Sequence, residues 1–127
     1  MRELLQAFEI TLDDMPPSLN NLYSSIDVRG SQRRVLSGAA RAWKQSATLI
    51  IRTAGRIAGF SIMPRQLFAV TIALQAPNVL QFDLDGKSKL LIDSACEAFG
   101  IDDRYLTELK MTKRRGETSV RIRIEAL

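Results

Sequence analysis

Acidic residues gather in one short stretch of this chain, at a spacing that suits the binding of a cation. Asp83 and Asp85 are two residues apart, and Asp102 and Asp103 close the same stretch. Six of the 14 acidic residues fall between positions 82 and 103, whereas positions 28 to 81 hold eight Arg or Lys and no Asp or Glu. Carboxylates held about 4 Å apart repel each other by roughly 4 kcal/mol at an effective dielectric of 20. The pattern therefore predicts a divalent cation, Mg²⁺ or Mn²⁺, bound by oxygen ligands beside a basic surface.

The rest of the composition removes several other chemistries. The chain has no histidine, which excludes histidine-dependent triads, zinc sites and general bases. Cys96 is the only cysteine, so a disulfide or a cysteine-based metal site within one chain is excluded as well. We interpret Cys96 as a core residue. The net charge of +4 and the pI of about 9.6 favour an anionic partner.

Length and hydropathy predict one soluble domain. A chain of 127 residues is long enough for one hydrophobic core, and we expect a single domain over residues 1–127. No run approaches the roughly 20 apolar residues that a membrane span needs, and the first residues lack the apolar segment of a secretory signal. We therefore expect a cytoplasmic protein with no membrane partner.

The first half of the chain must supply a strand, a loop, a helix and a second strand. Alternation of apolar and polar residues predicts a strand at Phe8–Leu12, and the composition from Pro16 to Arg34 indicates a long loop. Ser37 is a suitable N-cap for a helix of about 21 residues that ends at Gly59. Leu67–Leu74 is typical of a central strand covered on both faces. The buried face of the helix is expected to comprise Ala40, Trp43, Ala47, Ile50, Ile51, Ala54 and Ile57.

The second half carries the acidic stretch on a helix and ends in two strands. We predict the helix over Gly86–Phe99, with Asp85 as its N-cap and Gly100 as its stop. Alternating patterns at Tyr105–Thr112 and Thr118–Glu125 predict two strands that form a closing hairpin. The order strand, helix, strand, helix, strand, strand predicts an α+β fold, with a mixed sheet of about four strands packed against two helices.

A lysine follows the acidic pair at helical spacing. Lys89 comes one turn, about 6 Å, after Asp85, so its ammonium could reach a phosphate or a metal-bound water. Asp93 and Glu97 continue the same stripe, and we interpret them as a solvated face with pairing between residues four apart. For Asp83 and Asp85 the alternative to a cation site is helix capping, since Asp is favoured at helix starts in any case.

These residues together resemble the RusA-type Holliday-junction resolvases. The matching pattern in the second half is Asp83-Leu84-Asp85, Lys89, Asp93, and the pair Asp102-Asp103 after Gly100. The first half adds Pro16-Pro17-Ser18, Asn20, Asn21 and Tyr23. Chain length, element order and the two final strands also agree, so the resemblance covers essentially the whole chain. The sequence departs from the family at Gly86, where members usually have Asn, and at positions 78 to 81, which lack a basic cluster.

The resemblance implies a homodimeric, Mg²⁺-dependent endonuclease that nicks paired strands of four-way DNA junctions. By position, Asp83, Asp85 and Asp103 match the family's metal-binding catalytic carboxylates, and Lys89 matches its essential lysine. Two alternatives stay open. One is a non-catalytic nucleic-acid-binding protein with the same fold, and the other is a nuclease that acts on other branched DNA.

Basic residues outside the acidic stretch are candidates for phosphate contacts. The loop and the first turns of the first helix carry Arg29, Arg33, Arg34, Arg41 and Lys44, and positions 28 to 81 hold no acid to offset them. The predicted hairpin tip carries Lys113, Arg114 and Arg115, for which exposure to water alone is an equal alternative. Lys87 is interpreted as a solvated surface residue, with phosphate contact as its alternative. Binding through such residues weakens steeply with salt.

Overall fold

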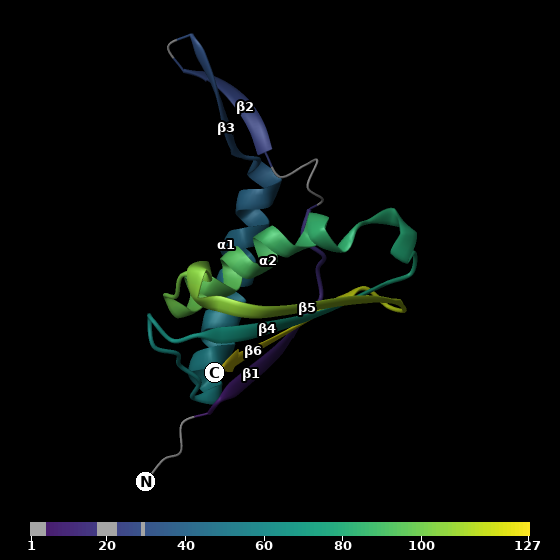
Figure 1. Cartoon of the computed structure of the whole chain (residues 1–127). Helices are drawn as coiled ribbons and strands as arrows, with labels where there is room; N and C mark the ends of the chain where they lie inside the picture. The colour runs from purple at the N-terminus through teal and green to yellow at the C-terminus, as the bar shows by residue number, and fades with distance from the viewer. Residues whose placement is uncertain (1–4, 18–22, 29) are drawn as a thin grey trace.

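The computed structural model describes residues 5–17, 23–28 and 30–127, and it describes only the backbone of residues 23–28 and 31–34. Its main sheet has four strands in the order β1-β6-β4-β5. The strands are β1 (Ala7–Leu12), β4 (Phe68–Ala76), β5 (Leu106–Arg115) and β6 (Ser119–Ala126), and the helices are α1 (Gly38–Ala58) and α2 (Leu84–Phe99). Strand β4 runs parallel to β5 and antiparallel to β6. The predicted α+β class, with a mixed four-stranded sheet and two helices, is confirmed (Figure 1).

The core lies between one face of the sheet and the two helices. Alternate residues of β4, namely Phe68, Val70, Ile72 and Leu74, are at most 2% exposed, as are Val120, Ile122 and Ile124 of β6. The intervening residues of β6 and β5 on the opposite face, such as Arg121 and Lys110, are exposed. The central position of β4 is confirmed, but the expectation that both of its faces are covered is wrong, because the helices cover only one.

Helix α1 forms as the sequence predicts. The Ser37 hydroxyl accepts a hydrogen bond from the Ala40 backbone N–H at 3.1 Å, and Gly59 ends the helix with a left-handed φ of 75°. Two residues of the predicted buried face are exposed instead, since Ile50 is 46% and Ile57 83% accessible. That part of α1 faces solvent.

Helix α2 begins two residues earlier than predicted. Leu84 is its first residue and Asp83, not Asp85, occupies the N-cap position. The Asp83 side chain makes no capping hydrogen bond, so capping does not account for this carboxylate. Gly100 ends the helix with a φ of 66°, as expected.

A two-stranded hairpin replaces part of the predicted loop between Pro16 and Arg34. Strand β2 (Tyr23–Val28) pairs with β3 (Ser31–Leu36), and Gly30 in the turn has a φ of 80°. The hairpin extends away from the main sheet beyond the first turn of α1 (Figure 1). Its strands join no other sheet, which explains why the alternation in this segment is weak.

The last two strands do not pair with each other as the sequence suggested. Strand β4 lies between them, and the connection from β5 to β6 crosses the end of β4, where the Gly116 N–H donates to the Ala76 carbonyl at 3.0 Å. The turn signal was therefore correct, but its partners were wrong, because the strand that separates β5 from β6 comes from earlier in the chain. Neither α-helix in the described part of the chain has the length and apolar composition to span a membrane.

Candidate functional site

The N-terminal end of α2 presents two unengaged carboxylates. Asp83 and Asp85 are exposed, and neither side chain makes a hydrogen bond or ion pair with any described residue. The backbone just before them is anchored, because the Lys113 ammonium donates to the carbonyls of Val79 and Phe82, both at 2.9 Å. Asp83 and Asp85 therefore start from a fixed backbone and face solvent.

Lys87 has a structural role in place of the expected exposure. It is only 8% exposed, and its ammonium donates to the Pro16 carbonyl at 2.6 Å, which ties the N-terminal segment to α2. Burial lowers the pKa of this lysine. The prediction of a solvated Lys87 side chain is wrong. Its ammonium contacts the Pro16 carbonyl, and not an external phosphate, in this structure.

Asp93 and Glu97, which continue the acidic stripe along α2, form ion pairs with two different lysines. The Lys89 ammonium lies 3.6 Å from the Asp93 carboxylate, four residues on, which confirms the local pairing expected for Asp93. Glu97 instead lies 3.0 Å from the ammonium of Lys44 on α1. Lys44 is therefore offset by an acid after all, one that is distant in sequence. Lys89 stays half exposed and can still reach a ligand.

The C-terminal end of α2 separates the roles of two adjacent aspartates. Asp102 accepts a hydrogen bond from the Arg104 backbone N–H at 2.9 Å and so caps the short turn Asp103–Tyr105. Asp103 is exposed, and its side chain makes no hydrogen bond or ion pair with a described residue. An open pocket of about 340 Å³ at this end is lined by Lys44, Asp93, Cys96, Glu97, Ile101, Asp102 and Asp103. Burial, followed by the charges of Asp103, Asp93 and Asp102, raises the pKa of the Cys96 thiol to about 12.

The three predicted metal ligands do not meet within one chain. Helix α2 has 16 residues and is about 24 Å long, with Asp83 and Asp85 at one end and Asp103 beyond the other. Among the described residues, no group of three His, Cys, Asp or Glu side chains is placed to hold a metal ion. A helix cannot fold back on itself, so the set of Asp83, Asp85 and Asp103 does not fit one shared ion in a single chain.

The remaining basic candidates fall into three groups. Arg29 lies outside the described residues, and Arg33 and Arg34 lie on β3 with side chains that are not described. Arg41, Arg114 and Arg115 are exposed, as a phosphate contact requires. Lys113, in contrast, is part-buried and holds the backbone before Asp83.

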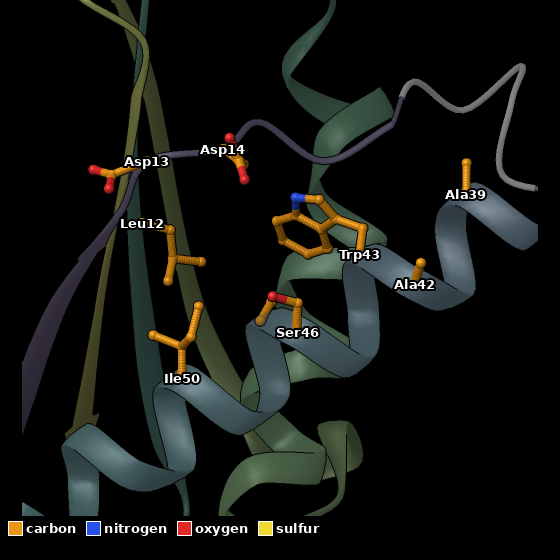
Figure 2. A pocket seen from close by; sticks show the side chains of 9 residues that line it. Leu12, Asp13, Asp14, Ala39, Ala42, Trp43, Ser46 and Ile50 are labelled. Carbon is orange, nitrogen blue, oxygen red and sulfur yellow. The ribbon is translucent and has the colours of Figure 1, made fainter.

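A pocket that the sequence did not indicate lies between α1 and the end of β1. It has a volume of about 420 Å³ and is lined by Leu12, Asp13, Asp14, Ala39, Ala42, Trp43, Ser46, Ala47 and Ile50. Figure 2 shows the Trp43 ring between α1 and the segment that carries Asp14. Its apolar wall is the same exposed side of α1 on which Ile50 lies. The sequence feature that could have indicated this pocket is the series of small residues Ala39, Ala42 and Ser46, three or four residues apart on α1.

No protein-family model matches the chain, and no curated protein matches it.

Proposed function

We propose that this chain is a structure-selective DNA endonuclease that resolves four-way junctions by paired nicking, as its resemblance to the RusA-type resolvases implies. The observation that carries the proposal is the unengaged state of three carboxylates. Asp83, Asp85 and Asp103 are exposed, and their side chains make no hydrogen bond or ion pair with a described residue. These are the three carboxylates that, by position, match the metal-binding catalytic residues of the RusA-type resolvases, and none of them is occupied by a structural contact.

The roles of the side chains follow from their positions. The carboxylates at the start of α2 orient and deprotonate an attacking water, and Lys89, one turn further, stabilises the negative charge that develops on the phosphate. Dependence on Mg²⁺ or Mn²⁺ rests on the resemblance, because the described residues of one chain do not bring the three predicted ligands together. The proposed setting is the cytoplasm.

A homodimer is part of the proposal, because symmetric nicking of a two-fold junction needs two active sites related by a two-fold axis. An exposed apolar stripe of α1 supports it. Leu49, Ile50 and Ile57 on this face are 60%, 46% and 83% exposed. Antiparallel packing of α1 on a second copy would place the small side chains of Ala42 and Ser46 opposite the bulkier Ile57 and Thr53, so that one surface complements itself.

The non-catalytic alternative also has an observation in its favour, namely the separation of Asp103 from Asp83 and Asp85 by the length of α2. One experiment decides between the two functions. The purified protein is given a synthetic four-way junction and a linear duplex, each with Mg²⁺ and with a chelator. We expect nicking of the junction that requires Mg²⁺ and exceeds nicking of the duplex.

The variant Asp85→Asn should lower the nicking rate about a hundredfold or more and leave junction binding intact, because it removes one catalytic charge from an exposed site. Glu9→Gln, which removes an exposed charge on β1, is the matched control and should nick as the wild type does. Normal binding without nicking by the wild-type protein would favour the non-catalytic function. Nicking of flaps in preference to junctions would favour action on other branched DNA.

A further inference from the structure

The helix-free face of the main sheet carries an ordered set of charges. Strand register places Lys110 and Arg123 on either side of Thr71 in β4, and Thr112 and Arg121 on either side of Ala73. One step further along β4, Arg114 lies beside Gln75. Neighbours in register point to the same face, so two rows of cations flank the uncharged residues of the central strand.

The charges on this face are divided along the strands. At the opposite end of the face, Glu108 and Glu125 flank Ala69, and Arg123 lies within 4.0 Å of the Glu125 carboxylate. Toward the other end, Lys110, Arg114 and Arg121 make no side-chain hydrogen bond or ion pair with any residue in the described part of the chain. Charged residues that served only to keep the protein in solution would not need to be sorted into an acidic end and a cationic end. The cationic half is therefore free to neutralise an external anion.

The shape of the cationic half suits an extended anion. Arg114, Arg121 and Ser119 border a shallow hollow of about 60 Å³, whose floor is formed by Ala73 and Gln75. Strands β5 and β6 are separated by β4, which puts the two cationic rows roughly 10 Å apart, and Lys110 lies about 13 Å from Arg114 along β5. Long side chains at these spacings can each meet a different phosphate of one nucleic-acid backbone. The hollow is too small for a base or a nucleotide.

The cationic half lies at the edge of the sheet that leads to the unengaged carboxylates. Strand β4 passes from Gln75 through the turn at Val79–Gln81 directly to Asp83 and Asp85. At the same edge, successive residues of β5 point to opposite faces of the sheet. Lys113 contacts the turn at Val79–Gln81, and Arg114 lies on the helix-free face.

We propose that the cationic half of the helix-free face, formed by Lys110, Arg114 and Arg121, binds the phosphate backbone of a DNA duplex. A duplex held there extends over the edge of the sheet toward Asp83 and Asp85. The inference rests on the proposed function for its purpose, since it names the surface that holds one arm of the substrate. It adds residues that the sequence pattern did not single out, apart from Arg114.

The test compares two double variants that each remove two positive charges. Arg114→Gln with Arg121→Gln changes the proposed surface, and Arg56→Gln with Arg65→Gln removes two exposed cations elsewhere. The measurement is the affinity for a linear 20-base-pair duplex at several salt concentrations, together with the unfolding temperature of each protein. The slope of log affinity against log salt falls in magnitude by about 0.9 for each phosphate that the protein no longer neutralises.

We expect the magnitude of this slope to fall by between about 1 and 2 in the surface variant. The control should keep the wild-type slope, and both variants should unfold at the wild-type temperature. Equal slopes in the two variants would overturn the inference, and so would a wild-type protein that does not bind the duplex. The nuclease proposal is judged separately. A wild-type protein that nicks no junction, but whose duplex binding depends on Arg114 and Arg121, would refute the nuclease and support this surface.

Discussion

The side chains of Asp102 and Asp103 illustrate how much the role of a residue depends on its local geometry. The two are adjacent and chemically identical, yet Asp102 accepts the Arg104 backbone N–H, whereas the Asp103 carboxylate has no partner among the described residues. The sequence could identify the pair but could not divide the roles. That division depends on which residue occupies the N-cap position of the short turn Asp103–Tyr105, and this residue is Asp102.

Cys96 reports on the position of Asp103 without any assay of activity. Its thiol pKa is raised to about 12, first by burial and then by Asp103, Asp93 and Asp102. The raised pKa keeps the thiol protonated at neutral pH, so its reaction with iodoacetamide should be slow and should accelerate as the pH rises toward 12. Asp103→Asn removes a negative charge and should lower the pKa, which gives several-fold faster alkylation at about pH 9.

The matched variant for this measurement is Asp85→Asn, which removes the same charge from the other end of α2. It should leave the alkylation rate of Cys96 unchanged, because Asp85 lies about three helical turns from Cys96. An equal acceleration by both variants would show that the two acidic groups are much closer together than the 16 residues of α2 allow.

The lysines show what sequence reasoning misses at the residue scale. Lys87 and Lys89 are two residues apart and both follow the acidic pair, but Lys87 is buried against the Pro16 carbonyl and Lys89 is exposed. Spacing on one helix predicts which residues share a face. It does not reveal that a segment 71 residues earlier covers one of those faces.

At the scale of elements, helices were easier to predict than strand pairing. The bounds of α1 follow from Ser37 and Gly59, which are local signals, and the structure confirms them. The partners of β5 and β6 depend on β4, which comes earlier in the chain, before α2. The hairpin of β2 and β3 was missed because its sequence has no sustained alternation and its two strands pair only with each other.

The exposed face of α1 provides a prediction about assembly. Ile57 is 83% exposed on a stripe with no charged residue, and we expect Ile57→Lys to weaken self-association at least about tenfold, because an apolar contact is replaced by a buried charge. Sedimentation velocity over a range of concentrations measures this. Thr118→Lys, at an exposed position between β5 and β6, is the control and should sediment as the wild type does.

Two results at this scale would count against the α1 interface. One is a wild-type protein that remains a monomer at high concentration. The other is a dimer that forms equally well with the Ile57→Lys variant. The second result would leave the dimer in place and move its interface to another surface.

At the scale of the whole molecule, the sheet separates two kinds of surface. The helices, the acidic stripe and the exposed face of α1 lie on the covered side, and the cationic half of the helix-free face lies on the other. Sequence reasoning found the acidic stripe, because its members share one helix. It missed the cationic half, because Lys110 and Arg121 become neighbours only through β4.

The whole molecule also explains why the expected cation site is incomplete in one chain. The motif joins residues that are close in sequence pattern, but a helix of about 24 Å holds its two acidic ends apart. The central claim therefore does not require that the three carboxylates bind one shared ion. It states that Asp83 and Asp85, at the start of α2, act in catalysis and that their side chains make no contact that stabilises the fold.

The most direct test of that claim is the rate of junction nicking by Asp83→Asn and Asp102→Asn. Asparagine can keep the hydrogen bond that Asp102 accepts, so both proteins should unfold at the wild-type temperature. We predict that Asp83→Asn nicks a four-way junction about a hundredfold or more slowly and that Asp102→Asn stays within a few-fold of the wild type. Equal rates for the two variants, or a larger reduction in Asp102→Asn, would contradict the account.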